Sequence, residues 1–143
     1  MDLSGIWYNE LNSILIISVR SDGTLSGSYT SGVGSSAPSL LLGLYSVSPR
    51  NSTNVGWIVN WKRLPSLTAW SGQAWDDPVS GQILVAMWHL TSGTSESQQS
   101  QSTLSGKDVF TRYEKSDEEV AIAMRSVAPS HPQRELSLHP VLL

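Results

Sequence analysis

The sequence predicts an all-β protein, an eight-stranded antiparallel up-and-down β-barrel followed by a C-terminal extension. Three observations support this fold class. Short segments alternate between apolar and polar residues with a period of two, which is typical of strands. Clusters of Gly, Pro, Asn, Asp and Ser separate them, and no convincing helix lies between them. Because an open meander leaves two unpaired edges, closure into a barrel is the economical arrangement.

The expected strands follow one another with short links. The first places Trp7 and Asn9 on one face, and the second ends at the hairpin sequence Ser21-Asp22-Gly23. The third alternates most cleanly, and its inward residues are Leu25, Gly27, Tyr29, Ser31 and Val33. A loop is expected over 34–39 and another over 93–102. The strands cover residues 5–11, 13–20, 24–33, 40–48, two runs within 56–75, then 82–92 and 103–115.

The stretch 56–75 holds four of the six tryptophans. A period of two puts Trp57, Val59 and Trp61 on one face, and Thr68 shares a face with Trp70 after the break at 64–66. Flat apolar walls with a few fixed polar groups suit a small ligand. Tryptophans also fill ordinary cores, so this pattern alone leaves both interpretations open.

Composition excludes several function classes. The 143 residues predict one domain with its own core, and a net charge of −3 gives no basic surface for nucleic acid. The absence of cysteine excludes disulfides and thiol chemistry, and three scattered histidines do not favour a metal site. No apolar run reaches membrane-spanning length. The start at Met1 fits either a cytoplasmic protein or a mature chain without its signal peptide.

The seventh expected strand is apolar on both faces. Its inner face carries Leu84, Ala86, Trp88 and Leu90. Its outer face carries Ile83, Val85, Met87 and His89. An apolar outer face predicts a subunit interface, and the alternative is that another part of the same chain covers it.

Several segments together resemble the avidin and streptavidin family in order and spacing. They are LSGIWYNELNS, GSYTSGVG, WIVNWK, TAWSGQ, AMWHLTSG and STLSGKDVFTR. The resemblance runs from about Leu3 to Tyr113. It implies a barrel that binds biotin in its open end without catalysis, with no further cofactor, in a secreted or periplasmic protein.

The resemblance also implies a role for each site residue. Donors to the ureido oxygen, arranged like an oxyanion hole, are Asn9, Ser13 and Tyr29. Acceptors of the two ureido N–H groups are Ser31 and Asp108. Thr68 approaches the ring sulfur, and the apolar walls are Trp61, Trp70, Trp88 and Leu90. Val33 lies in the covering loop, and Ser35 and Ser66 meet the carboxylate.

Other interpretations remain open at this stage. Asn9 and Ser13 flank a turn where such residues commonly bond the local backbone, and Tyr29 suits a core. A hydrolase lacks support because no nucleophile elbow is present and no histidine shares an interior face with Asp108. A lipocalin-like carrier of another apolar ligand fits the barrel, but such a ligand would leave the polar groups unsatisfied.

The chain departs from the family at two places. Where the tightest binders carry a tryptophan that reaches a neighbouring subunit, this chain has Ser100. Beyond Lys115 the resemblance ends, which predicts a barrel over 1–115 and an extension over 116–143. Ser116 and the acids after it favour a short helix, with an irregular tail beyond.

The expected assembly is a homodimer through the outer face of the seventh strand. The resemblance implies that dimers pair into tetramers through a smaller contact near Met87, Ser105 and Lys107. If Lys107 faces its own copy, like charges oppose that contact. We therefore expect a firm dimer and at most a weak tetramer.

Overall fold

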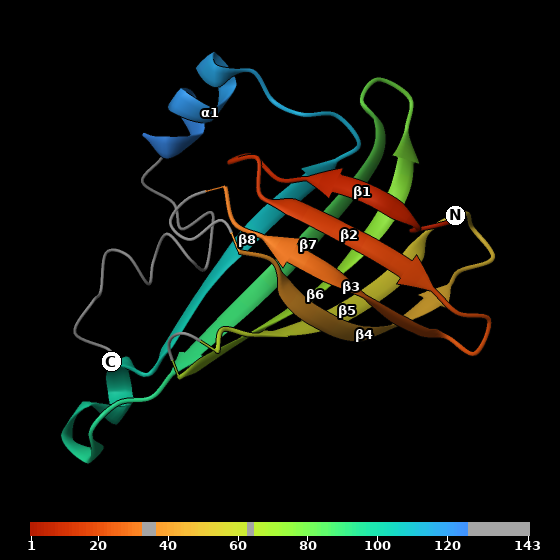
Figure 1. Ribbon diagram of the computed structural model, residues 1–143. Helices are drawn as coiled ribbons and strands as arrows, with labels where there is room; N and C mark the ends of the chain where they lie inside the picture. Colours follow the sequence, from red (N-terminus) through yellow and green to blue (C-terminus); the bar gives the residue numbers. More distant parts are fainter. Residues whose placement is uncertain (33–36, 63–64, 126–143) are drawn as a thin grey trace.

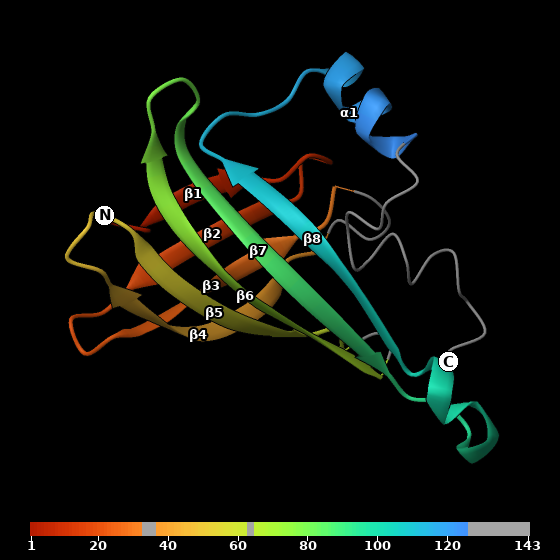
Figure 2. The same ribbon diagram turned by 180° about the vertical axis from the view of Figure 1, so that it is seen from behind.

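The computed structural model describes residues 1–32, 37–62 and 65–125, and it forms a closed antiparallel barrel (Figure 1). Each strand pairs with the next in the sequence, and β8 returns to β1. The predicted fold class is confirmed. The strands are β1 Gly5–Tyr8, β2 Ile14–Val19, β3 Thr24–Thr30, β4 Ser39–Val47, β5 Thr53–Asn60, β6 Ser66–Asp77, β7 Gly81–Ser92 and β8 Thr103–Thr111. Figure 2 shows β6, β7 and β8 as the long strands of one side.

Several elements differ from the sequence prediction, most clearly the ends of β1 and β8 and the loop before β8. β1 ends at Tyr8 instead of continuing to Leu11, because the side chain of Asn9 accepts backbone N–H groups and turns the chain. β8 ends at Thr111, four residues before Lys115. The segment expected to be a loop without helix contains a 3-10 helix, η1 Glu96–Gln101. This short helix is held by local backbone hydrogen bonds such as that from Gln98 N–H to the Ser95 carbonyl. Bonds of this kind leave no hydrophobic periodicity in the sequence, so the helix could not be predicted from the pattern.

Aromatic side chains fill the barrel interior in one row. Trp57 of β5 lies opposite Trp70 of β6, which lies opposite Trp88 of β7, and all three are buried. The rings of Trp57 and Trp70 stack at 5.3 Å with an interplanar angle of 13°. Aromatic pairs of this kind add about 0.5–1.5 kcal/mol beyond their buried area. The inward orientation predicted for these tryptophans is confirmed.

The outer surface carries two apolar strips. On β7, Met87 and His89 are exposed while Ile83 and Val85 are half-buried. On β4, Leu40, Leu42 and Leu44 are each about three-fifths exposed, at 63%, 59% and 65%. The β4 strip was not predicted, since a run of consecutive leucines hides which residues face outward. No helix among the described residues is long and apolar enough to cross a membrane.

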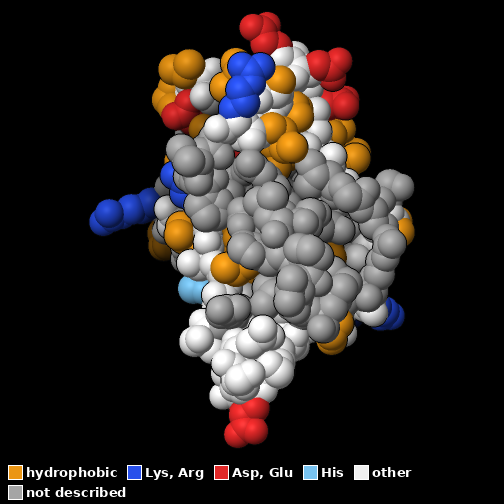
Figure 3. All heavy atoms as spheres, turned by 90° about the vertical axis from the view of Figure 1, so that its left-hand side faces the viewer, with side chains coloured by type: hydrophobic (Ala, Val, Ile, Leu, Met, Phe, Trp, Pro, Cys, Tyr) orange, Lys and Arg blue, Asp and Glu red, His pale blue; other side chains and the backbone are white. Residues whose placement is uncertain are grey.

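The extension begins with the helix α1, Asp117–Met124, as predicted. Ser116 caps it: its side chain accepts the Glu119 N–H, and the Glu119 carboxylate accepts the Ser116 N–H. None of the residues of α1 is buried. Figure 3 shows acidic side chains at the two ends of one face, over α1 and η1. The expected irregular tail, 126–143, lies outside the described residues.

Candidate ligand-binding site

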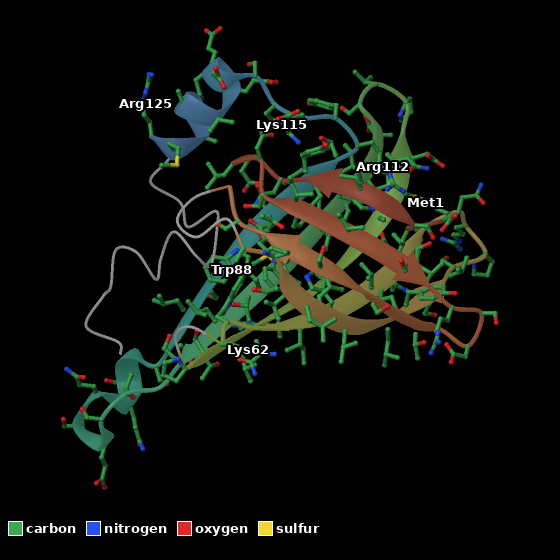
Figure 4. All side chains as sticks on the ribbon, viewed as in Figure 1. Met1, Lys62, Trp88, Arg112, Lys115 and Arg125 are labelled. Atoms are coloured by element: carbon green, nitrogen blue, oxygen red, sulfur yellow. The ribbon has the colours of Figure 1, made fainter. Side chains whose placement is uncertain are left out.

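The predicted contact residues that the structure describes come from six separate segments of the barrel. All of them are buried, and they are Asn9, Ser13, Tyr29, Ser31, Trp61, Ser66, Thr68, Trp70, Trp88, Leu90 and Asp108. Figure 4 shows Trp88 within the barrel. Val33 and Ser35 lie outside the described residues. Strand alternation turns the members on β3, β6, β7 and β8 inward. The other four lie directly beside strand ends, and they are Asn9, Ser13, Ser31 and Trp61.

Asp108 is the acidic group of the site. It lies on β8 opposite Ala86, and its side chain is fully buried. The Trp70 indole Nε1–H donates to Oδ2 at 2.7 Å, whereas Oδ1 is buried with no hydrogen-bond partner among the described residues. Burial raises the pKa of Asp108 well above its usual value, and the charge of Glu10 raises it further. The indole and the nearby Asn9 amide lower this pKa by less.

Asn9 shapes the turn between β1 and β2. Its Oδ1 accepts the backbone N–H groups of Leu11 and Ser13, each at 2.9 Å. The same side chain donates from Nδ2 to the Tyr29 hydroxyl at 3.4 Å. The turn-forming and ligand-binding interpretations of Asn9 therefore involve different atoms: Oδ1 holds the turn, and Nδ2 faces the barrel interior.

Tyr29 and Ser13 lie beside that amide. The Ser13 Oγ accepts the Gly32 N–H at 3.0 Å, and Ser13 is also hydrogen-bonded to Tyr29. Burial raises the pKa of Tyr29 well above its usual value, with the charge of Asp108 as the second cause. The phenol consequently keeps its proton at neutral pH and remains a hydrogen-bond donor.

Three rings form an aromatic cluster against these polar groups. Tyr29 lies 5.7 Å from Trp61 and 5.1 Å from Trp70, measured between ring centroids. Trp61 meets Trp70 edge-on at 6.4 Å. The Trp61 indole N–H donates to the Thr68 Oγ1 at 2.7 Å, which fixes the orientation of that ring. Bonds from both indoles hold the rings in place, so the apolar surface they present is preorganised.

Two residues near the site were not predicted. Ser92 pairs with Ser66 across β6 and β7, is buried, and its Oγ has no hydrogen-bond partner among the described residues. Ser92 lies on the same strand face as Leu90, so its inward orientation could have been predicted from the sequence. Glu10 accepts the Val109 N–H at 3.1 Å beside Asp108. No sequence signal pointed to Glu10, because a charged residue in a turn is normally solvated.

The arrangement combines hydrogen-bond donors, a buried carboxyl group and aromatic rings inside one barrel. Fixed polar groups among apolar walls are typical of small-molecule sites, so fold and site define a small-molecule-binding β-barrel. The Avidin family model matches residues 1–113, and the chain belongs to the avidin family. Members of this family are non-enzymatic binding proteins, and this chain is a binding protein of that kind.

Individual relatives agree with this assignment. Avidin of Gallus gallus is 31% identical over 117 residues, covering 77% of this chain and 77% of that protein. Avidin-related protein 4/5 of Gallus gallus is 34% identical over 116 residues, with the same shares. Fibropellin-1 of Strongylocentrotus purpuratus is 32% identical over 121 residues, which cover 80% of this chain and only 11% of fibropellin-1.

Proposed function

We propose that this protein binds biotin, without catalysis, inside the barrel. The observation that carries the proposal is that Oδ1 of buried Asp108 has no hydrogen-bond partner within the part of the chain that the structure describes. A buried carboxylate oxygen without a partner is costly, and a ligand N–H that donates to it removes that cost. The ureido group of biotin offers such N–H donors, together with a carbonyl oxygen that requires donors of its own.

The polar groups of the site match the two sides of a cyclic urea. Asn9, Ser13 and Tyr29 donate to the ureido oxygen, and Asp108 accepts one ureido N–H while Ser31 accepts the other. An ionised carboxylate at the N–H side polarises the urea and strengthens the bonds at its oxygen. A purely apolar ligand, as in a lipocalin-like carrier, would leave these groups unsatisfied.

The remaining contacts follow the shape of biotin. Trp61, Trp70, Trp88 and Leu90 enclose the ring system, with Thr68 near the sulfur. The carboxylate tail reaches Ser66 and its cross-strand neighbour Ser92, whose hydroxyl is available as a donor. Val33 and Ser35, in a segment outside the described residues, complete the proposed contact set.

A titration with biotin, followed by tryptophan fluorescence and by thermal unfolding, tests the proposal. Bound biotin should change the fluorescence of the buried tryptophans and raise the melting temperature, because a ligand specific for the folded state stabilises it. Asp76→Asn, at an exposed aspartate near the end of β6, serves as a matched control that should bind normally. If biotin changes neither signal in the wild type while a fatty acid does, the carrier interpretation replaces this one.

The proposed assembly is a homodimer through the outer face of β7, with at most a weak tetramer. Exposed Met87 and half-buried Val85 support a contact there. Met87 lies opposite Lys107 on β8, so a symmetric contact at this point brings lysines together. Light scattering across protein concentration and ionic strength tests the assembly. A monomer at micromolar concentration contradicts the dimer. If Leu42→Glu abolishes the dimer and Met87→Glu does not, the interface lies on β4 instead of β7.

We further propose that the protein acts outside the cytoplasm, secreted or in a periplasm. The only support is its likeness to the avidin family, since the described residues carry no location signal of their own. Fractionation of the native host with an antibody to the barrel tests this location. Recovery in the cytoplasmic fraction alone contradicts it.

A further inference from the structure

The barrel closes at a seam between β1 and β8 that has little backbone pairing. Tyr8 and Thr111 form the one register pair between these strands. On its other edge, β8 pairs with β7 along its whole length, from Ile83 opposite Thr111 to Thr91 opposite Thr103. Side chains therefore make most of the connection between the start and the end of the barrel.

Asn12 and Lys115 form the most complete of these side-chain connections. The Lys115 N–H donates to Asn12 Oδ1 at 2.8 Å, and Asn12 Nδ2 donates to the Lys115 carbonyl at 2.9 Å. The amide thus binds both backbone groups of Lys115, as a neighbouring strand would. Asn12 adopts a positive φ of 57°, a conformation that Asn tolerates better than most residues.

The Lys115 side chain adds a second connection. Its ammonium donates to the Tyr8 carbonyl at 2.8 Å and to Thr111 Oγ1, the two residues of the register pair. Figure 4 places Lys115 on the segment that leads from β8 to α1. Glu10 and Glu119 are the acids whose charges face the ammonium, and they oppose the desolvation that lowers its pKa to about 8.

Both connections attach to the turn that carries the proposed oxygen donors. Asn12 lies between Asn9 and Ser13, and its own N–H donates to the Asn9 carbonyl at 3.1 Å. At the same seam, Glu10 bonds the Val109 N–H next to Asp108. The end of β8 and the donor turn are consequently fixed to each other by Asn12, Lys115 and Glu10.

We infer that Asn12 and Lys115 form a clamp that positions the ligand-binding turn relative to Asp108. They are positioning residues, because their hydrogen bonds go to other residues of the chain. Lys115 lies beyond residues 1–113, so the clamp recruits a residue from outside the family match. The inference rests on the proposed function for its effect on biotin, but the ordering of the turn is independent of any ligand.

The test uses Asn12→Gly, which keeps the positive φ without strain and removes both clamp bonds. Biotin should dissociate about tenfold faster while association changes by less than about twofold, since a misplaced turn weakens the bound state. Asn51→Gly is the matched control, because Asn51 also has a positive φ (62°) but is exposed in the β4–β5 turn. It should dissociate at the wild-type rate.

Two further measurements separate positioning from general loss of structure. Amide exchange at Leu11 and Ser13, which donate to Asn9 Oδ1, should accelerate in ligand-free Asn12→Gly and not in Asn51→Gly. In a double-mutant cycle, Asn12→Gly and Ser13→Ala should be non-additive for biotin affinity, because the clamp acts through that donor. Unchanged exchange in Asn12→Gly overturns the clamp whether or not biotin binds. Absence of biotin binding in the wild type refutes only the proposed function.

Lys115→Met tests the ammonium separately from the backbone clamp. It should accelerate dissociation by about threefold, less than Asn12→Gly, because Asn12 still binds the Lys115 backbone. Lys107→Met removes the same charge from an exposed position near Glu10 and should have no such effect. Equal effects of the two lysine variants would assign the change to general electrostatics and contradict a role for the ammonium contacts.

Discussion

The β6–β7 wall and the β1–β8 seam close the same barrel by different means. In the wall, the register runs unbroken from Ser66 opposite Ser92 to Asp77 opposite Gly81. In the seam, one register pair is supplemented by the side chains of Asn12, Lys115 and Glu10. The wall supplies apolar rings and stability, whereas the seam and its adjoining turn carry three of the proposed polar contacts, Asn9, Ser13 and Asp108. Changes in the wall should therefore unfold the protein, and changes at the seam should disturb binding first.

The largest expected effect is on the wall. Trp88→Ala should lower the free energy of unfolding by about 3–5 kcal/mol, because it leaves a cavity in the barrel core. Denaturant unfolding of the ligand-free protein measures this loss. Trp75→Ala, at a half-buried position of the same sheet, is the control and should cost clearly less. Equal losses at both positions would contradict the view that the inner row carries the stability.

Asp108 gives the converse test. Asp108→Asn should weaken biotin binding by about 1.5–3 kcal/mol, the range for a hydrogen bond to a charged group. The same change should leave the free energy of unfolding unchanged or raise it, because a carboxyl group that burial destabilises when charged is replaced by an amide that carries no charge at any pH. Calorimetric titration and denaturant unfolding measure the two quantities. If Asp108→Asn loses stability and keeps its affinity for biotin, Asp108 contributes to the fold and not to ligand binding.

Proton release on binding tests the state of that carboxylate. In the folded ligand-free chain the pKa of Asp108 is raised above its value in the unfolded chain, which is about 3.9. The contribution of Asp108 to folding stability is therefore complete below pH about 3.9 and is lost as the pH rises through the pKa of the folded state. At a pH where the ligand-free carboxyl group is protonated, a ligand N–H favours the ionised form, so binding should release the proton and affinity should rise with pH, by at most about tenfold per pH unit. Glu10, Tyr29, Asn9 and Trp70 are the groups that face it.

Titrations in buffers of different ionisation enthalpy measure the released proton. Asp108→Asn should release none and should show a flat affinity profile over the same range. A proton taken up by the wild type, rather than released, would show that the ligand does not donate to Asp108.

The smallest expected effect concerns Ser100, which stands where the tightest binders of the family carry a tryptophan. Ser100 is exposed on η1, outside both the wall and the seam. A tryptophan there that covers about 40–60 Å² of ligand corresponds to about 1–1.5 kcal/mol at about 25 cal/mol/Å². Ser100→Trp should therefore slow biotin dissociation by roughly tenfold with little change in association. Ser97→Trp, on the same helix, is the control. Identical off-rates for wild type and Ser100→Trp would contradict the expectation that a tryptophan at this position covers the ligand.

Much of the site followed from local pattern. Period-two alternation predicted the inward orientation of Trp57, Trp61 and Trp70, and burial agrees. The same pattern contained the inward parity of Ser92, which the prediction nevertheless left out. Alternation is dictated by the pleat of a single strand, so no knowledge of neighbouring strands is needed to recognise it.

The sequence by itself determined the fold class and the inward face of most strands. Tertiary structure alone decided the end of β8, the contact of Glu10 with Val109 and the Asn12–Lys115 clamp. The clamp residues are 103 positions apart in the chain. A hydrogen bond over that separation exists only when the barrel closes and sets the register of its seam, and no residue-by-residue preference encodes that register. The lack of a partner for Oδ1 of Asp108 among the described residues is likewise a property of its surroundings, since only packing decides which polar atoms find partners.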